Sequence, residues 1–401
     1  MLFMKMNYPR LYLKPGREKA LLHGHPWLFS GAVASVEGKR APGDIVAVTD
    51  AGGRSLGLGF FNSRSDIIFR FLTADVDTRC DAHFWRERVR FAEALRRRIL
   101  PPDTTACRLI NAEGDGLPGL IVDRYDDVLV CSIATAGMEK NRTAVLDALT
   151  GVCSPRGIYE RSEGRARRLE GLEERSGWIY GSCEEGKRIP VRENGLYFEV
   201  DIVGGQKTGF FLDQRSNRKG VAGLSRGMTL LNCFSYSGAF SVYAARGGAE
   251  RVVSVDVSEG ANDMARFHLK KNGFSTERHP VIRADVFSWL RETEEVFDGI
   301  ILDPPAFAKS RKDIARSARG YKDINLQAMK HLQNGGLLWT FSCSSFMDEA
   351  LFQKVVLGAA CDTGKSVQLL KILGPGPDHP TSLAHMEGRY LKGLLLRVSD
   401  R

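Results

Sequence analysis

The chain has 401 residues, of which 43% are hydrophobic and 26% are charged, and it carries a formal net charge of +9 with a sequence pI near 9.1. This length is typical of two or three domains, and the composition is that of a soluble globular protein and excludes a low-complexity chain. The positive charge favours a polyanionic partner, because each Lys or Arg that neutralises a phosphate releases a counterion.

Cysteine usage and apolar runs bear on the compartment. The eight cysteines include no Cys-x-x-Cys pair, so zinc ribbons and thioredoxin-like redox sites lack their basic pattern. Met1–Arg10 has no long apolar core and no small-residue cleavage site, so we expect no signal peptide. No apolar run reaches the roughly 20 residues that span a membrane. We therefore expect a cytoplasmic protein without a bound metal or a membrane partner.

The first predicted domain covers residues 1–78 and consists of strands and turns. Arg17–His23 is a candidate for a short polar helix. Ile45–Val48, the turn Asp50–Gly53 and the alternating Ile67–Leu72 are typical of the strands of a small barrel. The segment is mildly basic and its charges are interleaved with aromatic residues.

The second predicted domain covers residues 79–190 and combines helices with strands. Ala82–Leu100 has the pattern of a helix with an arginine-rich outer face, which is usually a solvated surface and less often a contact for RNA. The strands expected after it are Cys107–Ile110, Leu120–Asp123, Val128–Ile133 and Gly157–Glu160, with a helix at Asn141–Leu149. This α+β unit alone indicates no chemistry.

The third predicted domain covers residues 191–401, and in it apolar strands alternate with helices. The expected strands are Thr229–Asn232, Arg251–Asp256, Pro280–Arg283, Phe297–Leu302 and Gly336–Ser342. The expected helices are Gly238–Arg246, Gly260–Asn272, Val286–Glu292, Lys322–Leu332 and Met347–Asp362. Such alternation implies right-handed βαβ units and a parallel sheet covered on both faces. The fold class that we predict is α/β, with a doubly wound Rossmann-like domain.

Ligands of open parallel sheets bind beyond the carboxyl ends of the strands, so the residues just after each strand matter most. After the first strand comes Asn232–Phe240, which contains Phe234, Ser235 and a single glycine, Gly238. A dinucleotide fingerprint needs three glycines to bring the backbone against a pyrophosphate. A loop with one glycine better suits a ligand without phosphates, such as the amino-acid end of S-adenosylmethionine.

Three further strands end in carboxylates. Asp256 is positioned to accept hydrogen bonds from ribose hydroxyls, and Asp285 to accept one from an adenine amino group. Asp303 begins an Asp-Pro-Pro sequence after the fourth strand. Each acid could instead be a helix N-cap and nothing more. The fifth strand likewise ends in polar residues, Ser342, Cys343 and Ser344. Polar residues at the ends of successive strands nevertheless favour a binding site.

These motifs together resemble one family. They are Lys14–Lys19, His25–Trp27, Arg108–Asp115, Gln206–Arg215, Asn232–Gly238, Asp303–Phe307, Gly320–Asn325 and Phe341–Ser344. The chain resembles, over nearly its whole length, the bacterial 23S ribosomal RNA 5-methylcytosine methyltransferases of the large-subunit methyltransferase I type. The Asp-Pro-Pro motif alone is weak evidence, since amino-group methyltransferases carry close relatives of it. The resemblance implies an N-terminal PUA domain, a central α+β domain and a class I methyltransferase domain that uses S-adenosylmethionine.

The resemblance also implies a mechanism. Cys343 takes the position of the nucleophile that adds to carbon 6 of cytosine. The alternative is a purely structural role for Cys343 as a small, buried apolar residue. Asp303 is its natural partner on the N3/N4 edge of the base. Some related enzymes carry a second cysteine where this chain has Ala306, so a two-cysteine scheme is in doubt. Phe307 is expected either to stack on the flipped base or to pack in the core. No residue stands out as the base that removes the carbon-5 proton.

The resemblance implies site residues beyond the reacting centre. For the cofactor they are Asn232, Phe234, Ser235, Gly238, Asp256, Asp285 and Asp303, with Gln206–Arg215 expected to cover it. For 23S ribosomal RNA the candidates are Arg17, Lys19 and the exposed part of Trp27 in the PUA-like segment, although for Trp27 a place in the barrel core is favoured.

Other readings of the same residues remain open. A guanine-N7 ribosomal RNA methyltransferase shares the Asn-x-Phe-Ser-Tyr loop and the Asp-Pro-Pro motif, but guanine N7 needs no thiol to react. A catalytically inactive RNA-binding assembly protein is a second alternative, against which the intact set of strand-end residues argues. A nicotinamide dehydrogenase is disfavoured by the missing glycines. The target nucleotide and the oligomeric state have no signal in the sequence.

Overall fold

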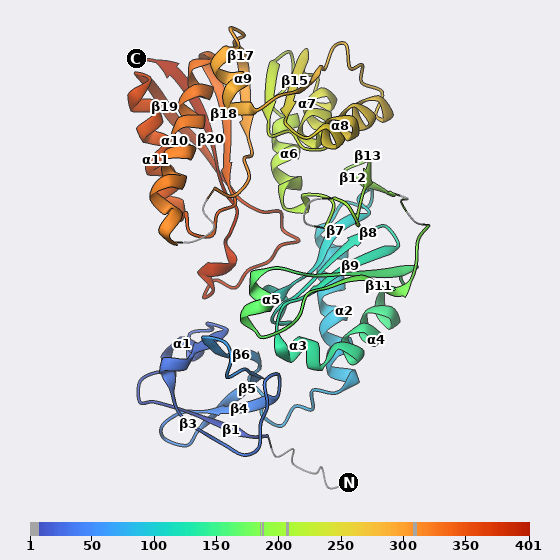
Figure 1. The fold of residues 1–401 in the computed structure, drawn as a ribbon, viewed down its shortest axis with the longest axis vertical. Helices are drawn as coiled ribbons and strands as arrows, with labels where there is room; N and C mark the ends of the chain where they lie inside the picture. The colour runs from blue at the N-terminus through green and yellow to red at the C-terminus, as the bar shows by residue number, and fades with distance from the viewer. Residues whose placement is uncertain (1–7, 185, 187, 206–207, 308–310) are drawn as a thin grey trace. The chain divides into compact units, whose positions relative to one another are not determined.

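The computed structural model describes residues 8–184, 186, 188–205, 208–307 and 311–401 (Figure 1). The chain forms two compact units, each built from segments that are distant in the sequence. Unit 1 consists of Met1–Val191, Val200–Phe210 and Pro377–Gly388, and unit 2 consists of Arg192–Glu199, Phe211–Gly376 and Arg389–Arg401. Across the described ranges, every helix is too short or too polar to serve as a transmembrane span.

Unit 1 begins with an open six-stranded sheet in the order β2-β6-β5-β4-β1-β3, a half-barrel. Its elements are β1 (Arg10–Leu13), α1 (Lys19–Leu22), β2 (Trp27–Phe29), β3 (Val33–Glu37), β4 (Ile45–Thr49), β5 (Ser55–Phe61) and β6 (Ile67–Thr73). Side chains alternate between the two faces of a strand, so Val46 and Val48 point the same way and pack with Leu11 and Phe69 in a fully buried core.

The rest of unit 1 is a five-stranded sheet, in the order β11-β10-β9-β8-β7, with helices packed on it. Its elements are α2 (Ala82–Ile99), β7 (Ala106–Asn111), β8 (Leu120–Tyr125), β9 (Val128–Ile133), α3 (Ala136–Lys140), α4 (Arg142–Cys153), β10 (Gly157–Ser162), α5 (Arg165–Leu169) and β11 (Arg175–Gly181). The α2 helix begins after Asp81, whose carboxylate accepts the N–H groups of His83 and Phe84 and so caps the first turn. It buries Trp85 and Val89 in the core beneath the sheet.

Two further strands, β12 (Ile189–Glu193) and β13 (Leu196–Val200), pair as a separate hairpin. Unit 2 is then a seven-stranded sheet in the order β16-β15-β14-β17-β18-β20-β19. Its strands are β14 (Thr229–Cys233), β15 (Arg251–Asp256), β16 (Val281–Arg283), β17 (Phe297–Leu302), β18 (Leu332–Ser342), β19 (Lys365–Leu373) and β20 (Lys392–Asp400). The first five run parallel, and β20 is antiparallel to both of its neighbours.

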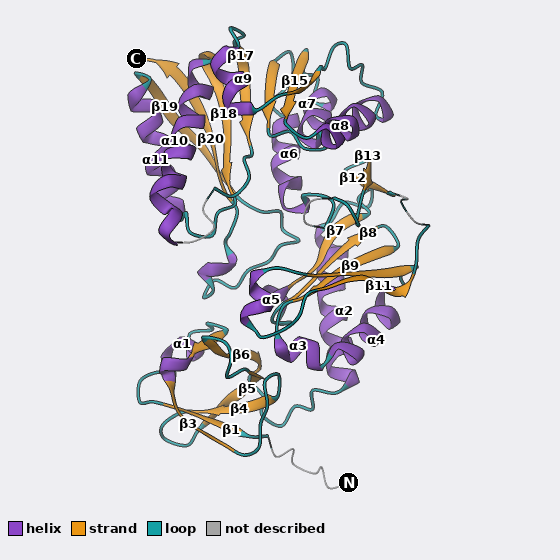
Figure 2. Ribbon diagram, viewed as in Figure 1, coloured by secondary structure: helices purple, strands orange, loops and turns teal. Residues whose placement is uncertain are grey.

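Helices cover both faces of this sheet, as Figure 2 shows. They are α6 (Arg215–Ala222), α7 (Ala239–Arg246), α8 (Glu259–Lys271), α9 (Val286–Glu292), α10 (Ile314–Lys330) and α11 (Glu349–Asp362). Neighbouring strand residues enter different cores: Leu231 packs with α9, α10 and α11, whereas Leu230 packs with α6 and α7. Burial on both faces explains why these strands are continuous apolar runs rather than alternating ones.

The structure confirms the predicted α/β class, and two of its differences from the expected elements concern the unit 2 sheet and its helices. The α10 helix begins at Ile314, eight residues before the expected start at Lys322, because polar residues of its first turns obscured the apolar period. The long strands β19 and β20 were not predicted at all. They pair antiparallel with Leu369 opposite Leu396, and the Pro377–Gly388 segment between them belongs to unit 1.

Candidate active site

The carboxyl ends of four parallel strands meet at one edge of the unit 2 sheet. Cys233 at the end of β14 lies opposite Val255 of β15 and Leu302 of β17, and Leu302 lies opposite Thr340 of β18. Because the register aligns these ends, the loops that follow them share the edge where open α/β sheets bind ligands. The strand-end residues predicted from the sequence therefore come from neighbouring strands.

The loop after β14 has an unusual backbone. Phe234 and Tyr236 adopt left-handed conformations with φ of 56° and 45°, and Gly238 follows with φ of 73°. Such conformations are costly for residues other than glycine and persist only where the surroundings enforce them. Gly238 is needed for a second reason, because a Cβ there would lie 2.7 Å from the Cβ of Ala265 on α8. This close approach lets α7 begin directly behind the loop.

Three polar atoms of this segment are buried without a hydrogen-bond partner among the described residues. They are Asn232 Oδ1, Ser235 Oγ and Ser237 Oγ. The amide nitrogen of Asn232 donates to Ser241 Oγ at 2.9 Å, and Ser241 in turn contacts Ser254 Oγ at 2.7 Å, so the orientation of Asn232 is fixed. Buried polar atoms are nearly always hydrogen-bonded. Unpaired oxygens and hydroxyls at a strand-end loop therefore fit the polar end of a small ligand.

Asp256 holds the loop in place from the neighbouring strand. One carboxylate oxygen accepts the backbone N–H of Tyr236 at 2.9 Å, and the other accepts that of Ser258 at 2.9 Å. Ser258, not Asp256, is the N-cap of α8. A carboxylate has about four acceptor sites, so the two amides leave capacity for ribose hydroxyls. Asp256 thus supports the loop structurally and can also accept hydrogen bonds from a ligand.

Asp285 has a different environment. Its carboxylate accepts the N–H of Ser288 at 2.9 Å, so the residue is the N-cap of α9, and it is exposed. The expected alternative role of Asp285 as a helix N-cap is therefore observed. Binding of an adenine amino group by the remaining acceptor sites stays a prediction.

The segment after β17 carries Asp303 and Phe307. Asp303 is half-buried, and Pro304 behind it is buried. The ring of Phe307 lies 4.6 Å from that of Tyr321 and 6.0 Å from that of Phe287, centroid to centroid, and it is half-buried. Packing in the core therefore accounts for part of the Phe307 side chain, and stacking on a base stays a prediction for the rest.

Cys343 follows β18 and is half-buried between the fully buried Ser342 and Ser344. Its side chain packs at the margin of the core that contains Phe341. The hydroxyls of Ser344 and Tyr321 lie 3.1 Å apart, which fixes the turn after Cys343 to α10. Burial raises the pKa of Tyr321, so this phenol stays protonated at neutral pH. The thiol is thus held by rigid neighbours while part of it remains accessible.

Sequence reasoning missed Lys392, which lies beside this turn. In the antiparallel pairing of β18 with β20, Lys392 is opposite Ser342. Its Nζ donates to the carbonyl of Ser344 at 2.6 Å and to that of Tyr390 at 2.7 Å. Burial lowers the pKa of Lys392 to about 8, against an opposing influence of Cys343 and Asp348. Only the strand pairing reveals this neighbour, because no motif connects the two positions.

Comparison with known proteins gives the family. Residues 11–74 match a PUA-like domain model, and residues 122–397 match the model of an S-adenosylmethionine-dependent methyltransferase, which is more than half of the chain. The chain is 44% identical over 392 residues to "Ribosomal RNA large subunit methyltransferase I" of Aeromonas salmonicida, covering 97% of this chain and 99% of that protein. The protein of the same name from Vibrio cholerae is 42% identical over 396 residues, with 97% and 99% covered. The chain belongs to the ribosomal RNA large subunit methyltransferase I family.

Solved structures share the fold of this ribosomal RNA large subunit methyltransferase I family member. A chain described as a SAM-dependent methyltransferase from Streptococcus mutans aligns with a TM-score of 0.81 at 24% identity, covering 97% of this chain and 99% of that one. A methyltransferase described as complexed with SAH aligns with a TM-score of 0.83 at 24% identity and the same coverage. The protein is thus a half-barrel PUA domain, a central sheet domain and a Rossmann-like, S-adenosylmethionine-dependent methyltransferase domain.

The PUA-like half-barrel of this family member presents the two predicted RNA-binding side chains. Arg17 and Lys19 are both exposed. The expectation for Trp27 was wrong, because its ring is only half-buried and lies outside the barrel core. Its indole N–H donates to Glu113 at 2.8 Å, and its ring centroid lies 4.3 Å from that of His385. Trp27 therefore joins the half-barrel to other segments of unit 1.

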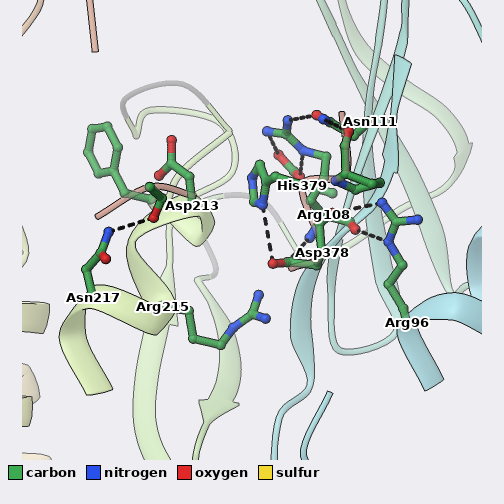
Figure 3. Close-up of polar contacts among 12 residues, drawn as sticks. Arg96, Arg108, Asn111, Asp213, Arg215, Asn217, Asp378 and His379 are labelled. Carbon is green, nitrogen blue, oxygen red and sulfur yellow. Dashed lines mark hydrogen bonds and ion pairs between the residues drawn. The ribbon is translucent and has the colours of Figure 1, made fainter. Parts of the chain in front are cut away.

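The central domain holds a buried ion-pair network that sequence reasoning also missed (Figure 3). The guanidinium of Arg96 donates to Asp115, with one of the two bonds at 2.8 Å, and to the carbonyl of Asp378 at 2.8 Å. The Asp378 carboxylate accepts the backbone N–H of Arg108 at 2.9 Å. These bonds fasten the Pro377–Gly388 segment into unit 1.

Gln206 and Lys207, at the start of the segment expected to cover the cofactor, lie outside the described residues. Within the described part of the chain, no group of three or more His, Cys, Asp or Glu side chains is arranged to hold a metal ion.

Proposed function

We propose that this family member forms 5-methylcytosine in 23S ribosomal RNA, in the cytoplasm, with Cys343 as the nucleophile. One observation carries the proposal. Cys343 is a partly accessible cysteine at the carboxyl end of β18, on the edge where polar atoms of Asn232, Ser235 and Ser237 in the β14 loop have no partner among the described residues. The name of the Aeromonas salmonicida relative supports large-subunit ribosomal RNA as the substrate.

The chemistry of cytosine requires such a group. Carbon 5 is a poor nucleophile until a thiolate adds to carbon 6, which leaves an enamine-like ring that reacts at carbon 5. S-adenosylmethionine supplies an electrophilic methyl group. Once carbon 5 carries the methyl group, it loses its proton to a base, and the bond from Cys343 Sγ to carbon 6 breaks to restore both the ring and the thiolate. Guanine N7 would need none of these steps, so a cysteine at this position favours cytosine.

Asp303 and Phe307 are proposed to orient the base. Asp303 follows β17, the strand next to β18, and a carboxyl group there can hold the N3/N4 edge and favour protonation at N3 as the thiolate adds. The part of the Phe307 ring that Tyr321 and Phe287 leave uncovered can stack on the base. An enzyme that acts on a base must receive it unstacked, so such contacts stabilise the flipped state.

The donor is proposed to occupy the loop after β14. Asn232 Oδ1 and Ser235 Oγ face its polar end, Gly238 permits its close approach, and Phe234 lines the same loop. Asp256 would accept the ribose hydroxyls with the acceptor sites that its two amides leave free. Asp285 and Asp303 complete the predicted set at the next strand ends.

The three predicted domains have separate proposed tasks. Residues 1–78 bind RNA through Arg17 and Lys19, and residues 191–401 carry out methyl transfer. Residues 79–190 link these two domains along the chain. The formal charge of +9 agrees with a polyanionic substrate. Exposed basic side chains on the half-barrel then add affinity without taking part in the reaction.

One experiment tests the product. The protein is incubated with S-adenosylmethionine carrying a labelled methyl group and with unmethylated 23S RNA, and the digested nucleosides are separated and identified. The expected product is labelled 5-methylcytidine. Labelled 7-methylguanosine would replace the proposal by the guanine-N7 alternative. Binding of RNA without any transfer, together with no cofactor binding by calorimetry, would indicate an inactive assembly protein.

A further inference from the structure

The ammonium group of Lys392 is buried and lacks a carboxylate partner. Its side chain belongs to a residue that is only 7% exposed, and among the described residues no Asp or Glu lies within ion-pair distance of it. Both of its protein hydrogen bonds go to backbone carbonyls, those of Ser344 and Tyr390. One of its three N–H donors therefore has no partner in the described part of the chain.

Such an arrangement is expensive in free energy. A buried charge is normally paired, because neutral carbonyls replace the lost hydration only in part. The cost is visible in this site, where burial lowers the pKa of Lys392 to about 8. A methionine of similar length would fill the same space on β20 without that cost. The position therefore has a use for the charge itself.

Cys343 is the group whose charge acts most strongly on Lys392. Lys392 lies opposite Ser342 in the β18–β20 register and donates to the carbonyl of Ser344, so it contacts the chain on both sides of Cys343. The influence is mutual: a thiolate at Cys343 raises the pKa of Lys392, and an ammonium near a thiol stabilises its thiolate form to the same degree. The thiolate is the form that attacks.

We infer that Lys392 is a positioning residue for Cys343, which fixes the backbone beside the thiol and stabilises its thiolate. This inference rests on the proposed role of Cys343 as the nucleophile. The charge acts through the cysteine and makes no contact with substrate that the structure describes. The antiparallel pairing of β20 with β18 is what places Lys392 beside the turn that contains Cys343.

Other titratable groups surround Lys392 and Cys343. On α10, Tyr321 contacts Ser344 and remains neutral, because burial raises its pKa. At the start of α11, the exposed Asp348 caps the helix through Leu351 N–H and favours the charged form of Lys392. Tyr390, before β20, donates its hydroxyl to Asp213 at 2.6 Å. Among these described groups around Cys343, Lys392 is the one that can carry a positive charge.

Two variants separate charge from anchoring. Lys392→Gln keeps an N–H donor for the Ser344 carbonyl but removes the charge, whereas Lys392→Arg keeps both. The full-length protein is alkylated with iodoacetamide over a range of pH, and the rate at Cys343 is followed by mass spectrometry of its peptide. Exposed Cys361 on α11 serves as an internal control, since its profile should be the same in all three proteins if they are folded.

The expected result is a shift in Lys392→Gln alone. Loss of one nearby positive charge should move the midpoint of the Cys343 profile upward by about one pH unit, and so slow alkylation about tenfold below the midpoint. Lys392→Arg should keep the parental midpoint. A parental midpoint in Lys392→Gln, or equal shifts in both variants, would overturn the inference. The assay needs neither RNA nor cofactor, so the inference can stand if the product is not 5-methylcytidine, and it can fail if the product is.

Discussion

Two regions of the molecule bury polar groups in opposite ways. In unit 1, Arg96 is 1% exposed, and its guanidinium is paired with the carboxylate of Asp115 and the carbonyl of Asp378, whose carboxylate in turn accepts the backbone N–H of Arg108. At the carboxyl edge of the unit 2 sheet, Ser235 Oγ and Asn232 Oδ1 have no partner among the described residues, and the Lys392 ammonium has only carbonyls.

The difference separates structural from functional polarity. A fully matched network rigidifies the fold and leaves no capacity for a ligand. Buried polar atoms without partners lower the stability of the fold. They persist mainly where they serve ligand binding or catalysis. The first region should therefore respond to mutation through stability, and the second through cofactor binding and turnover.

The largest expected effect is at the nucleophile. Cys343→Ala should lower the rate of methyl transfer at least about 10⁴-fold, because it removes the thiolate that is proposed to form the carbon-6 adduct. Its affinity for the cofactor should stay within a few fold, since the donor binds at the β14 loop. Single-turnover transfer and calorimetry measure the two quantities. Cys361→Ala, at an exposed position, is the matched control, and full activity in Cys343→Ala would remove the proposed mechanism.

The matched network should fail through stability. Arg96→Met leaves Asp115 buried without its partner, which typically costs about 3–5 kcal/mol in the free energy of unfolding. The control is Arg90→Met on the same helix, where an exposed pair with Glu87 contributes about 0–1 kcal/mol. Chemical denaturation of both variants gives the comparison. A loss at Arg96 no larger than that at Arg90 would mean that the network is dispensable.

The unmatched ammonium should make stability depend on pH. The folded-state pKa of Lys392 is about 8, against a usual 10.5, so between these values the unfolded chain binds the extra proton and stability rises with pH. Full loss of the penalty amounts to about 3 kcal/mol at ~1.4 kcal/mol per unit. The measurement is the free energy of unfolding of the parent minus that of Lys392→Gln, at pH values below 8 and near 10. A difference that stays flat with pH would contradict the assignment.

The smallest expected effect contrasts two serines. Ser235→Ala removes a hydroxyl that has no partner in the described part of the chain, so the free energy of unfolding should change little. The cofactor dissociation constant should rise about five- to tenfold, which corresponds to one hydrogen bond. Ser241→Ala removes a hydroxyl that contacts Asn232 and Ser254, and it should lower stability by about 1–3 kcal/mol. Melting curves measure the stability of the two variants, and calorimetry measures their affinity for the cofactor. Equal changes in both quantities for the two variants would contradict the distinction between paired and unpaired polar groups.

The strand-end residues were predictable because buried parallel strands leave continuous apolar runs in the sequence. Asp256 and Asp285 both follow such runs, yet one braces the β14 loop and the other caps α9. Which role applies depends on where the neighbouring loop passes, and a linear pattern does not contain that distance.

The missed and mistaken residues share a physical cause. Lys392 lies beside Cys343 only because β20 pairs antiparallel to β18. Trp27 has the apolar ring typical of a core residue. Its indole N–H, however, donates to Glu113, 86 positions away in the sequence, and its ring packs against His385. Pairings of such separation carry no local signal. The resemblance to a family supplied the nucleophile, whereas its electrostatic surroundings needed the structure.

The Pro377–Gly388 segment sets an order on biosynthesis. It belongs to unit 1 although it is translated after most of unit 2, and it supplies Asp378, the buried partner of Arg96 and Arg108. Domains commonly fold from the N-terminus as they emerge from the ribosome. Unit 1 begins to emerge first, but its hydrogen bonds to Asp378 cannot form until the Pro377–Gly388 segment has been synthesised. A nascent chain halted before this segment would therefore hold Arg96 without one of its acceptors.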